Sequence, residues 1–136
     1  MNTPEKAALV REMLGRVGDK WTLLVIDALD EAGHELRFSQ LRDTIGGISQ
    51  KMLTKTLREL ERDGLVQRRV YAEVPPRVDY RLTRLGQGLG EAVCGVWEWV
   101  EHNIAAVERA RRDYGSRVTA RGAPTPAAAA TRARSR

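Results

Sequence analysis

The amino-acid sequence predicts a mainly α-helical fold with one small β-hairpin. Apolar residues recur at helical spacing in five segments, and two runs rich in β-branched and aromatic residues lie close together before the last of them. Capping residues and glycines mark where these segments begin and end. The 136 residues have the usual size of one domain, and a content of 42% hydrophobic and 30% charged residues is typical of a globular protein.

The first two helices are expected at 4–17 and about 20–31. Thr3 precedes the first and Asp19 precedes the second, and both side chains are good N-caps. The second segment is apolar nearly all round, which predicts a helix buried in the core. Gly33 is expected to end it.

Two further helices are expected around a tight turn. Ser39 is interpreted as the N-cap of a short helix at 39–45, and Ser49 as the N-cap of a longer one at 49–63. The pair Gly46-Gly47 lies between them and forces the turn. Two helices joined in this way can place the second one in the major groove of DNA.

A hairpin is expected next, because 66–71 and 78–82 are β-rich runs. Pro75 and Pro76 lie between the runs, where they prevent ladder hydrogen bonds and stiffen the tip. The order of elements predicts a winged helix-turn-helix with a recognition helix at about 49–63 and a wing at about 66–82.

The last helix is expected from 84 to about 114, with Thr83 as its N-cap. Glycines at 86, 88 and 90 lower helix propensity, and they indicate either close contact with another element or a weakened start. From 117 to 136 the chain is rich in Arg, Ala and Pro, which predicts a disordered tail after a single domain of 1–116. The tail arginines either add salt-dependent affinity for phosphates or are merely solvated.

Charge is distributed unevenly along the chain, whose net charge is +5. Residues 37–84 contain eleven basic and six acidic side chains, whereas residues 1–36 contain four and seven. A basic block within a folded segment favours a polyanion as partner. The sequence lacks an apolar run long enough to span a bilayer and a secretory signal at its start, so a cytoplasmic location is the expectation.

The predicted recognition helix and wing carry side chains suited to double-stranded DNA. Polar and basic residues lie on the outward face and N-terminal end of the helix, where side chains reach base edges: Ser49, Gln50, Lys51, Thr54, Lys55 and Arg58. Arginines on the wing suit contacts with the backbone or the minor groove: Arg68, Arg69 and Arg77. The competing interpretation is that these charges only keep the helix solvated.

Five fragments resemble, in order and at matching spacing, the HxlR-type winged-helix transcriptional regulators. They are Gly18-Asp19-Lys20-Trp21, Arg37-Phe38-Ser39-Gln40-Leu41, the run 47–54 from Gly47 to Thr54, the run 57–66 from Leu57 to Val66, and the run 75–83 from Pro75 to Thr83. Gly86 closes the last fragment. Together they cover residues 18–86, and Trp97 fits an aromatic residue often found in the last helix.

The resemblance implies a bacterial homodimer that binds an inverted-repeat operator, as a repressor more than an activator. It also implies N- and C-terminal dimerisation helices. The apolar stripe of the last helix agrees, because it exceeds what a small core can bury. The expected interface includes Leu9, Met13, Leu89, Val93, Val96, Trp97 and Val100, although any of them could instead belong to the core of one protomer.

The sequence departs from the family at its cysteines. Many members sense oxidants through a cysteine before the Gly-Lys-Trp motif, but residues 1–20 contain none and Cys94 is the only thiol. A lone cysteine on a half-apolar helix favours inert packing over a sensor. With His34 and His102 it forms too small a set for an all-nitrogen and sulfur zinc site, so we expect no metal and no cofactor.

Other functions have weaker support. The motifs of nucleotide-binding and hydrolytic enzymes are absent, so the sequence does not predict an enzyme. A winged-helix protein-interaction module is the main alternative, with the arginines facing an acidic protein surface. An unidentified small-molecule effector between the last helix and the winged core is compatible with DNA binding.

Overall fold

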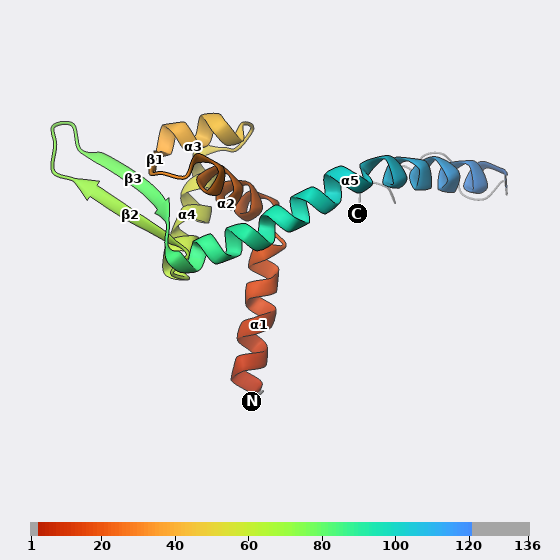
Figure 1. The fold of residues 1–136 in the computed structure, drawn as a ribbon, viewed down its shortest axis with the longest axis horizontal. Coiled ribbons are helices and arrows are strands. Elements are labelled where there is room, and N and C mark those ends of the chain that lie inside the picture. The colour runs from red at the N-terminus through yellow and green to blue at the C-terminus, as the bar shows by residue number, and fades with distance from the viewer. Residues whose placement is uncertain (1–2, 121–136) are drawn as a thin grey trace. The chain divides into compact units, whose positions relative to one another are not determined.

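The structure is a computed structural model that describes residues 3–120. Its elements, in chain order, are α1 (Pro4–Val17), α2 (Lys20–Ala32), β1 (Leu36–Arg37), α3 (Phe38–Ile45), α4 (Gln50–Arg62), β2 (Val66–Tyr71), β3 (Arg77–Leu82) and α5 (Arg84–Ala120) (Figure 1). The chain divides within α5 into two compact units, one ending at Gly95 and one beginning at Val96. The fold is mainly helical with a small antiparallel sheet, as the sequence predicts.

Four of the predicted N-caps are confirmed. Thr3, Asp19, Ser49 and Thr83 each accept a hydrogen bond from the backbone N–H three residues later, at 3.0 to 3.2 Å. Each bond satisfies one of the N–H groups that the first turn of a helix leaves without a partner. The starts of α1, α2, α4 and α5 are therefore encoded locally.

The start of the short helix differs from the prediction. α3 begins at Phe38 with Arg37 as its N-cap residue, so Ser39 is not the cap. The side chain of Gln40 accepts a hydrogen bond from the Arg37 backbone N–H at 2.8 Å. Because Leu36 and Arg37 are held extended in strand β1, the helix can begin directly after the strand.

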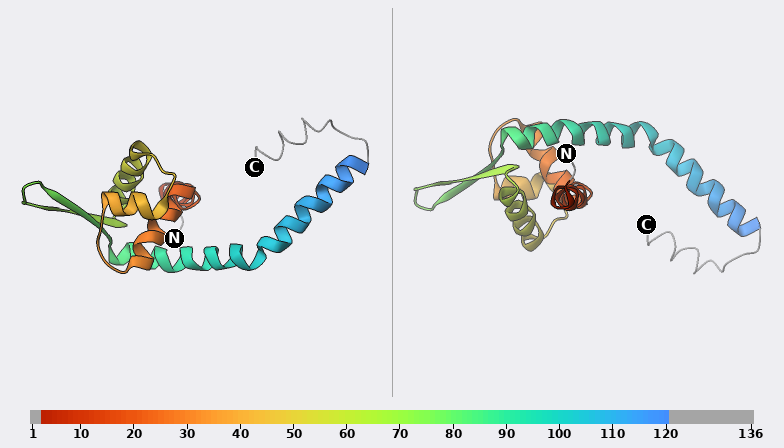
Figure 2. Two further views of the ribbon diagram at one scale, coloured as in Figure 1. Left: turned by 90° about the horizontal axis from the view of Figure 1, so that it is seen from above. Right: turned by 90° about the horizontal axis from the view of Figure 1, so that it is seen from below.

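The sheet has three strands in the order β1-β3-β2, where the sequence predicts two. β3 pairs along its length with β2 and, through Tyr80 and Asp79, with Leu36 and Arg37 of β1. The hairpin of β2 and β3 projects beyond helices α2–α4, as the two views of Figure 2 also show. A two-residue strand carries too short a pattern to be found by alternation.

The core is organised around α2, as its all-round apolar sequence predicts. Val25 and Ile26 are fully buried and Leu29 is nearly so. Side chains from α3, α4 and the turn before β2 pack against them: Leu41, Leu53, Leu57, Leu60, Leu65 and Val66. This packing holds α4 against α2 and fixes which face of α4 points outward.

The glycines at the start of α5 have different roles. A Cβ on Gly86 would lie 2.0 Å from the carbonyl oxygen of Leu65, and one on Gly90 would lie 2.9 Å from a carboxylate oxygen of Asp30. A Cβ on Gly88 would meet open space. Close contact therefore explains Gly86 and Gly90 but leaves Gly88 as a residue that only weakens the helix.

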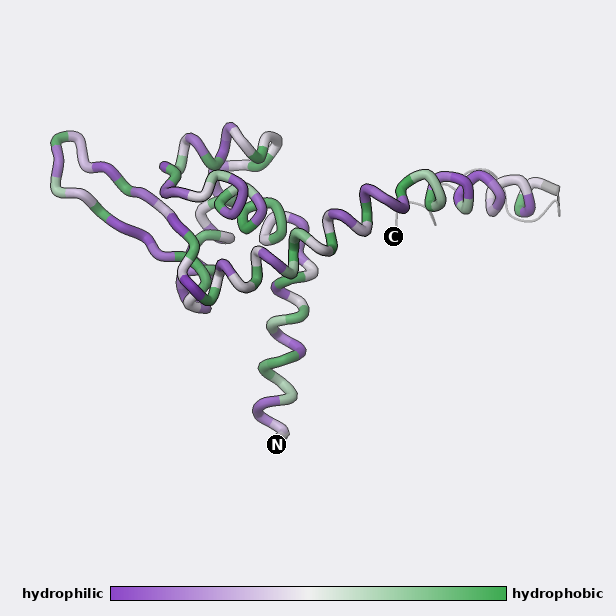
Figure 3. The backbone as a smooth tube through the Cα atoms, viewed as in Figure 1, coloured by the Kyte–Doolittle hydropathy of each residue, from purple (hydrophilic) through white to green (hydrophobic). Residues whose placement is uncertain are grey.

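α5 continues to Ala120, beyond the predicted end near 114, so residues 117–120 are helical rather than part of a tail. The rest of the predicted tail, 121–136, lies outside the described residues. Figure 3 shows apolar residues recurring along both α1 and α5. Within residues 3–120, every helix is too short or too polar to span a membrane.

Candidate nucleic-acid interface

The turn between α3 and α4 positions the N-terminus of α4. Gly46 and Gly47 adopt φ values of 70° and 69°, a region that L-residues with a side chain rarely enter. Ile48 follows them and is buried, which anchors the turn to the core. Ser49 then caps α4, so the first turn of this helix begins at a fixed place on the surface.

α4 has two chemically distinct faces. Leu53, Leu57 and Leu60 are buried, whereas Lys51, Lys55 and Arg58 are exposed on the other side. These three cations make no ion pair with any residue in the described part of the chain. Of the other predicted recognition residues, Ser49 and Gln50 are exposed and Thr54 is half-buried. The face thus offers unneutralised positive charge beside polar groups at a helix N-terminus, which suits phosphates and base edges.

Along the basic stripe of α4, Arg58 is the last of the basic residues without an acidic partner in the described part of the chain. The next basic residue, Arg62, lies within 3.7 Å of Glu12 and 3.6 Å of Asp63. Its charge is therefore balanced by carboxylates on α1 and at the end of its own helix, so the unneutralised part of the stripe lies toward the N-terminal end of α4.

The three predicted wing arginines all have acidic partners. Arg68 lies 4.0 Å from Glu61, and Arg69 lies 3.9 Å from Glu35. These two arginines remain exposed, and exposed ion pairs of this length stabilise a fold by at most about 1 kcal/mol. A phosphate can therefore compete for them at small cost.

Arg77 is held more firmly than the sequence predicts. Its guanidinium lies 3.6 Å from Asp79 and 3.7 Å from Glu73, and it stacks 4.0 Å from the centre of the Tyr71 ring. Its side chain is half-buried by these contacts. Arg77 therefore braces the hairpin next to its tip, where the sequence suggests a residue suited to contact with the DNA backbone or minor groove.

Tyr71 links the wing to the segment before β1. Its hydroxyl donates a hydrogen bond to Glu35 at 3.0 Å, and the Arg69 guanidinium lies 5.0 Å from its ring centre. This hydrogen bond is the main cause that lowers the pKa of Glu35; partial burial opposes it, and the charge of Arg69 assists. The tip-side end of the β2–β3 ladder is thus tied to the segment before β1 by side chains as well as by strand pairing.

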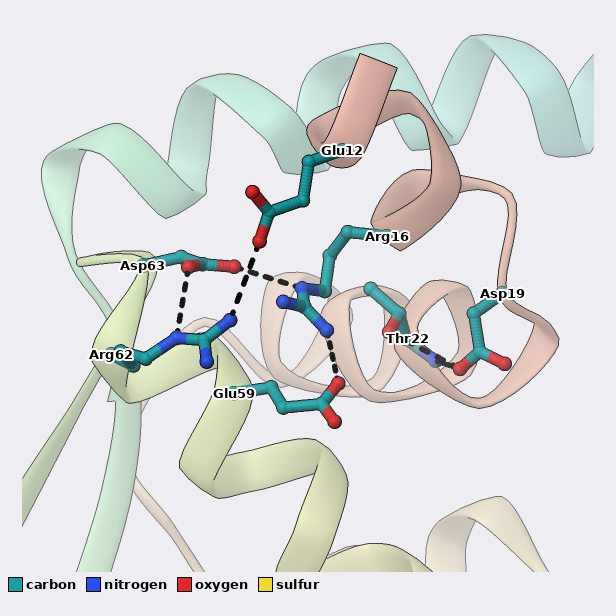
Figure 4. A network of polar contacts seen from close by, with 7 residues as sticks. All are labelled: Glu12, Arg16, Asp19, Thr22, Glu59, Arg62 and Asp63. Carbon is teal, nitrogen blue, oxygen red and sulfur yellow. Dashed lines mark hydrogen bonds and ion pairs between the residues drawn. The ribbon is translucent and has the colours of Figure 1, made fainter. Parts of the chain in front are cut away.

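A cluster of five charged residues joins α1 to the C-terminal end of α4, and sequence reasoning missed it. We call it the α1–α4 ion-pair junction; it consists of Glu12, Arg16, Glu59, Arg62 and Asp63 (Figure 4). The signal in the sequence is paired spacing: residues 12 and 16, like residues 59 and 63, are one helical turn apart. The pattern does not say which helices meet, so only the fold reveals the cluster.

Arg16 is the centre of the junction. Its Nε donates to Asp63 at 2.8 Å, and its second donor nitrogen bonds and ion-pairs with Glu59. Its side chain is only 13% exposed. Burial acts to lower the pKa of Arg16, but the hydrogen bond to Asp63 and the charge of Glu59 raise it above its ordinary value. The guanidinium is therefore held in its charged form, as arginine is in proteins generally.

The predicted interface residues separate into three groups. Leu9, Val96, Trp97 and Val100 are exposed by 41 to 57%. Met13 and Leu89 are half-buried against the core. Val93 is 3% exposed, so it is a core residue of its own protomer and offers no surface to a partner.

Cys94 is exposed, which differs from the expected inert packing. His34 lies in the loop after α2, as expected. It borders an open groove of about 520 Å³ between the end of α2, β3 and the start of α5, with Leu29, Glu35, Arg81 and Glu91 among the other lining residues. The groove lies between the last helix and the winged core, where the sequence allows a small-molecule effector.

Two relatives illustrate how similar this chain is to known proteins. YtfH of Escherichia coli, described as an uncharacterized HTH-type transcriptional regulator, is 45% identical over 97 residues, which are 71% of this chain and 75% of YtfH. A protein of Methanothermobacter thermautotrophicus with the same description is 42% identical over 99 residues, which are 73% of this chain and 74% of that protein.

Solved structures agree with the fold. YtfH of Salmonella typhimurium matches with a TM-score of 0.69 and 40% identity, over 76% of this chain and 90% of that one. The redox regulator HypR in its oxidized form matches with a TM-score of 0.63 and 40% identity, over 69% and 95%. The sequence model of the HxlR-like helix-turn-helix family matches residues 16–108 of this chain. This chain therefore belongs to the HxlR-like helix-turn-helix family of transcriptional regulators.

Proposed function

We propose that the protein is a homodimeric, sequence-specific DNA-binding regulator that reads an inverted repeat with α4. The observation that carries this proposal is the exposed face of α4, where Lys51, Lys55 and Arg58 have no acidic partner in residues 3–120. Ser49 and Gln50 lie at the end of the helix that enters the major groove first. The cations supply affinity for phosphates, and the polar side chains discriminate between base edges.

The dimer follows from exposed apolar surface on two helices. Leu9 on α1 and Val96, Trp97 and Val100 on α5 each expose 41% or more of their surface, which is costly for a helix that remains alone. A two-fold axis relates the two copies of α4, and their half-sites then lie about one helical turn, 10–10.5 bp, apart. A dimer that covers a promoter in this way excludes polymerase without any further contact, so we propose repression as its action.

The proposal is tested by binding to the DNA upstream of the protein's own gene. We expect strong preference for this fragment over a scrambled duplex, and a steep loss of affinity when salt is raised from about 50 to 200 mM. Lys51→Ala should weaken binding and relax specificity at one position in each half-site. Lys6→Ala removes the same charge from the exposed surface of α1 and serves as the matched control.

Two results would contradict the proposal. Unchanged affinity of Lys51→Ala would show that α4 does not present this face to DNA. Weak binding that is equal on both duplexes would favour a winged-helix module that uses its basic face to bind an acidic protein. In either case the family membership stands; the first result changes the face that binds DNA, and the second changes the partner.

A further inference from the structure

α1 is attached to the rest of its unit almost entirely through its C-terminal end. None of its residues is buried, and Leu9, Val10 and Leu14 are exposed by 57, 49 and 65%. Met13 packs against the core one turn from the end of the helix. The specific polar links from α1 to α4 are those of the α1–α4 ion-pair junction. The direction of α1 therefore depends on few groups.

The junction has a geometry that fixes direction. One guanidinium bonds two acidic residues a turn apart on α4, Glu59 and Asp63, through two nitrogens of the same planar group. A planar fork with two partners restrains rotation as well as distance, which a lysine cannot do. Asp63 is itself fixed, because it is the C-cap residue of α4 and its backbone N–H donates to the Glu59 carbonyl at 3.0 Å.

Burial strengthens the bonds of Arg16 to Glu59 and Asp63. The side chains of Arg16 and Asp63 are 13% and 15% exposed, so salt screens them less than it screens a surface pair. Removing one partner from such a cluster leaves a carboxylate in a poorly solvated place, whereas most surface pairs can be removed at little cost. Arg62 and Glu12, at 3.7 Å and both more than half exposed, form the weaker outer part of the junction.

A small change of angle at the junction produces a large displacement at the N-terminal end of α4. The helix has 13 residues, and at 1.5 Å per residue it is about 20 Å long. Because α4 is packed against α2, a tilt at the junction carries the whole winged core with it. A tilt of about 10° over this length displaces Ser49 and Gln50 by roughly 3.4 Å, which equals the rise of one base pair.

We infer that Arg16 is a positioning residue, which sets the angle between α1 and the recognition helix and thereby the half-site spacing that the dimer accepts. This inference rests on the proposed function, in which α1 is held by a second copy and α4 reads DNA. Arg16 touches no base in this scheme. It acts through Glu59 and Asp63, which connect the proposed dimer helix to the helix that reads the sequence.

The first test needs no DNA. Spin labels at Lys6→Cys and Glu61→Cys, in a Cys94→Ser background diluted with unlabelled protein, report the distance between α1 and α4 within one protomer. We expect a narrow distribution for the parent and a distribution at least twice as wide for Arg16→Gln, with Arg16→Lys intermediate. Equal widths in the parent and Arg16→Gln would overturn the inference and leave the proposed function standing.

The second test measures operator affinity as the spacer between half-sites is lengthened or shortened by 1 or 2 bp. We expect the parent to lose tenfold or more per base pair, and Arg16→Gln to lose less than threefold. Glu59→Gln combined with Asp63→Asn removes the same contacts from the other side of the junction. This double variant should likewise make affinity less dependent on spacer length. Asp19→Ala removes the cap bond to Thr22 shown in Figure 4, so it destabilises α2 but should keep the parent profile.

The outcomes separate the two proposals. A steep dependence of affinity on spacer length in all variants would overturn the role of Arg16 while confirming specific binding. A parent protein that prefers no operator would overturn the proposed function, and the role of Arg16 in reading DNA with it. A flat profile in Asp19→Ala would show that any loss of stability has this effect, which also contradicts a specific role for Arg16.

Discussion

Gly86 lies against the backbone of Leu65 so closely that a Cβ there would be 2.0 Å from the Leu65 carbonyl oxygen. The same carbonyl accepts a hydrogen bond from the Thr83 backbone N–H at 3.0 Å, and the Thr83 hydroxyl donates to the Gly64 carbonyl at 2.6 Å. The start of α5 is thus fastened to the turn that connects α4 to the wing. A residue without a side chain is required at this contact.

Gly86→Ala should therefore destabilise the protein, because the atom it meets is backbone and cannot move aside. We expect a loss of about 2 kcal/mol or more in the free energy of unfolding, measured by urea denaturation. Gly88→Ala is the matched control, since its Cβ meets open space and alanine favours the helix by about 0.5–1 kcal/mol. Equal effects of the two substitutions would contradict the close contact.

The cations of α4 and of the wing should differ in how they depend on salt. Lys55→Ala and Arg58→Ala remove charges without an acidic partner in the described chain, so each should lower the slope of log affinity against log salt by about 0.9 if it contacts one phosphate. Arg77 braces the hairpin through Glu73, Asp79 and Tyr71, so Arg77→Ala should reduce stability as well as affinity. A loss of slope without a loss of stability in Arg77→Ala would show that its bracing contacts are unimportant.

Two apolar substitutions should separate the dimer surface from the core. Leu9→Glu places a charge on an exposed apolar position and should shift the protein toward monomer in sedimentation, with its helix content retained. Val93→Ala removes two methyl groups from the core and should cost about 2 kcal/mol of stability with little effect on the monomer–dimer equilibrium. A concentration-independent monomer mass for the parent protein would refute the dimer itself.

The wing should weaken in acid. The pKa of Glu35 is lower in the folded protein than its ordinary value of 4.5, mainly because Tyr71 donates a hydrogen bond to it. The folded state then binds fewer protons than the unfolded state, so this stabilisation is full above about pH 4.5 and is lost as the pH falls through the folded value. The difference in unfolding free energy between the parent and Tyr71→Phe should shrink from pH 6 to pH 3, and a constant difference would contradict the assignment.

The solitary thiol should not regulate DNA binding. Cys94 is exposed on α5, and no second cysteine exists in the sequence to form an internal disulfide. We expect the same operator affinity for the parent and Cys94→Ser, with and without peroxide, in gel-shift titrations. A loss of affinity that occurs only in the oxidised parent would contradict this and show that oxidation of Cys94 controls binding.

Features that depend on residues within one helical turn of each other were predicted well from the sequence. The caps at Asp19, Ser49 and Thr83 each need only a side-chain oxygen and an N–H three residues later. The buried stripe of α4 likewise follows from the spacing of Leu53 and Leu57. These patterns fixed the order of the helices and, with it, the outward face of α4.

Features that depend on contacts between distant segments were missed. Ser39 has the chemistry of a cap, but the extended backbone at Arg37 places the N-cap two residues earlier. The bracing of Arg77 and the junction at Arg16 depend on which carboxylates the fold brings near. Charge and spacing restrict such pairs, but only tertiary packing selects them.

The shortest strand has a consequence for how the chain folds. Leu36 pairs with Tyr80, so a loop of more than forty residues must close before β1 has a partner, and that loop contains α3, α4 and β2. We expect closure of this size to slow folding and to make the pairing of β1 with β3 a late event. We then expect the helix-turn-helix and the wing to open as one cooperative unit, which amide exchange at β1 should report. A fragment that ends before β3 would lose the strand with which β1 pairs, and with it the pairing that holds the start of α3 in place.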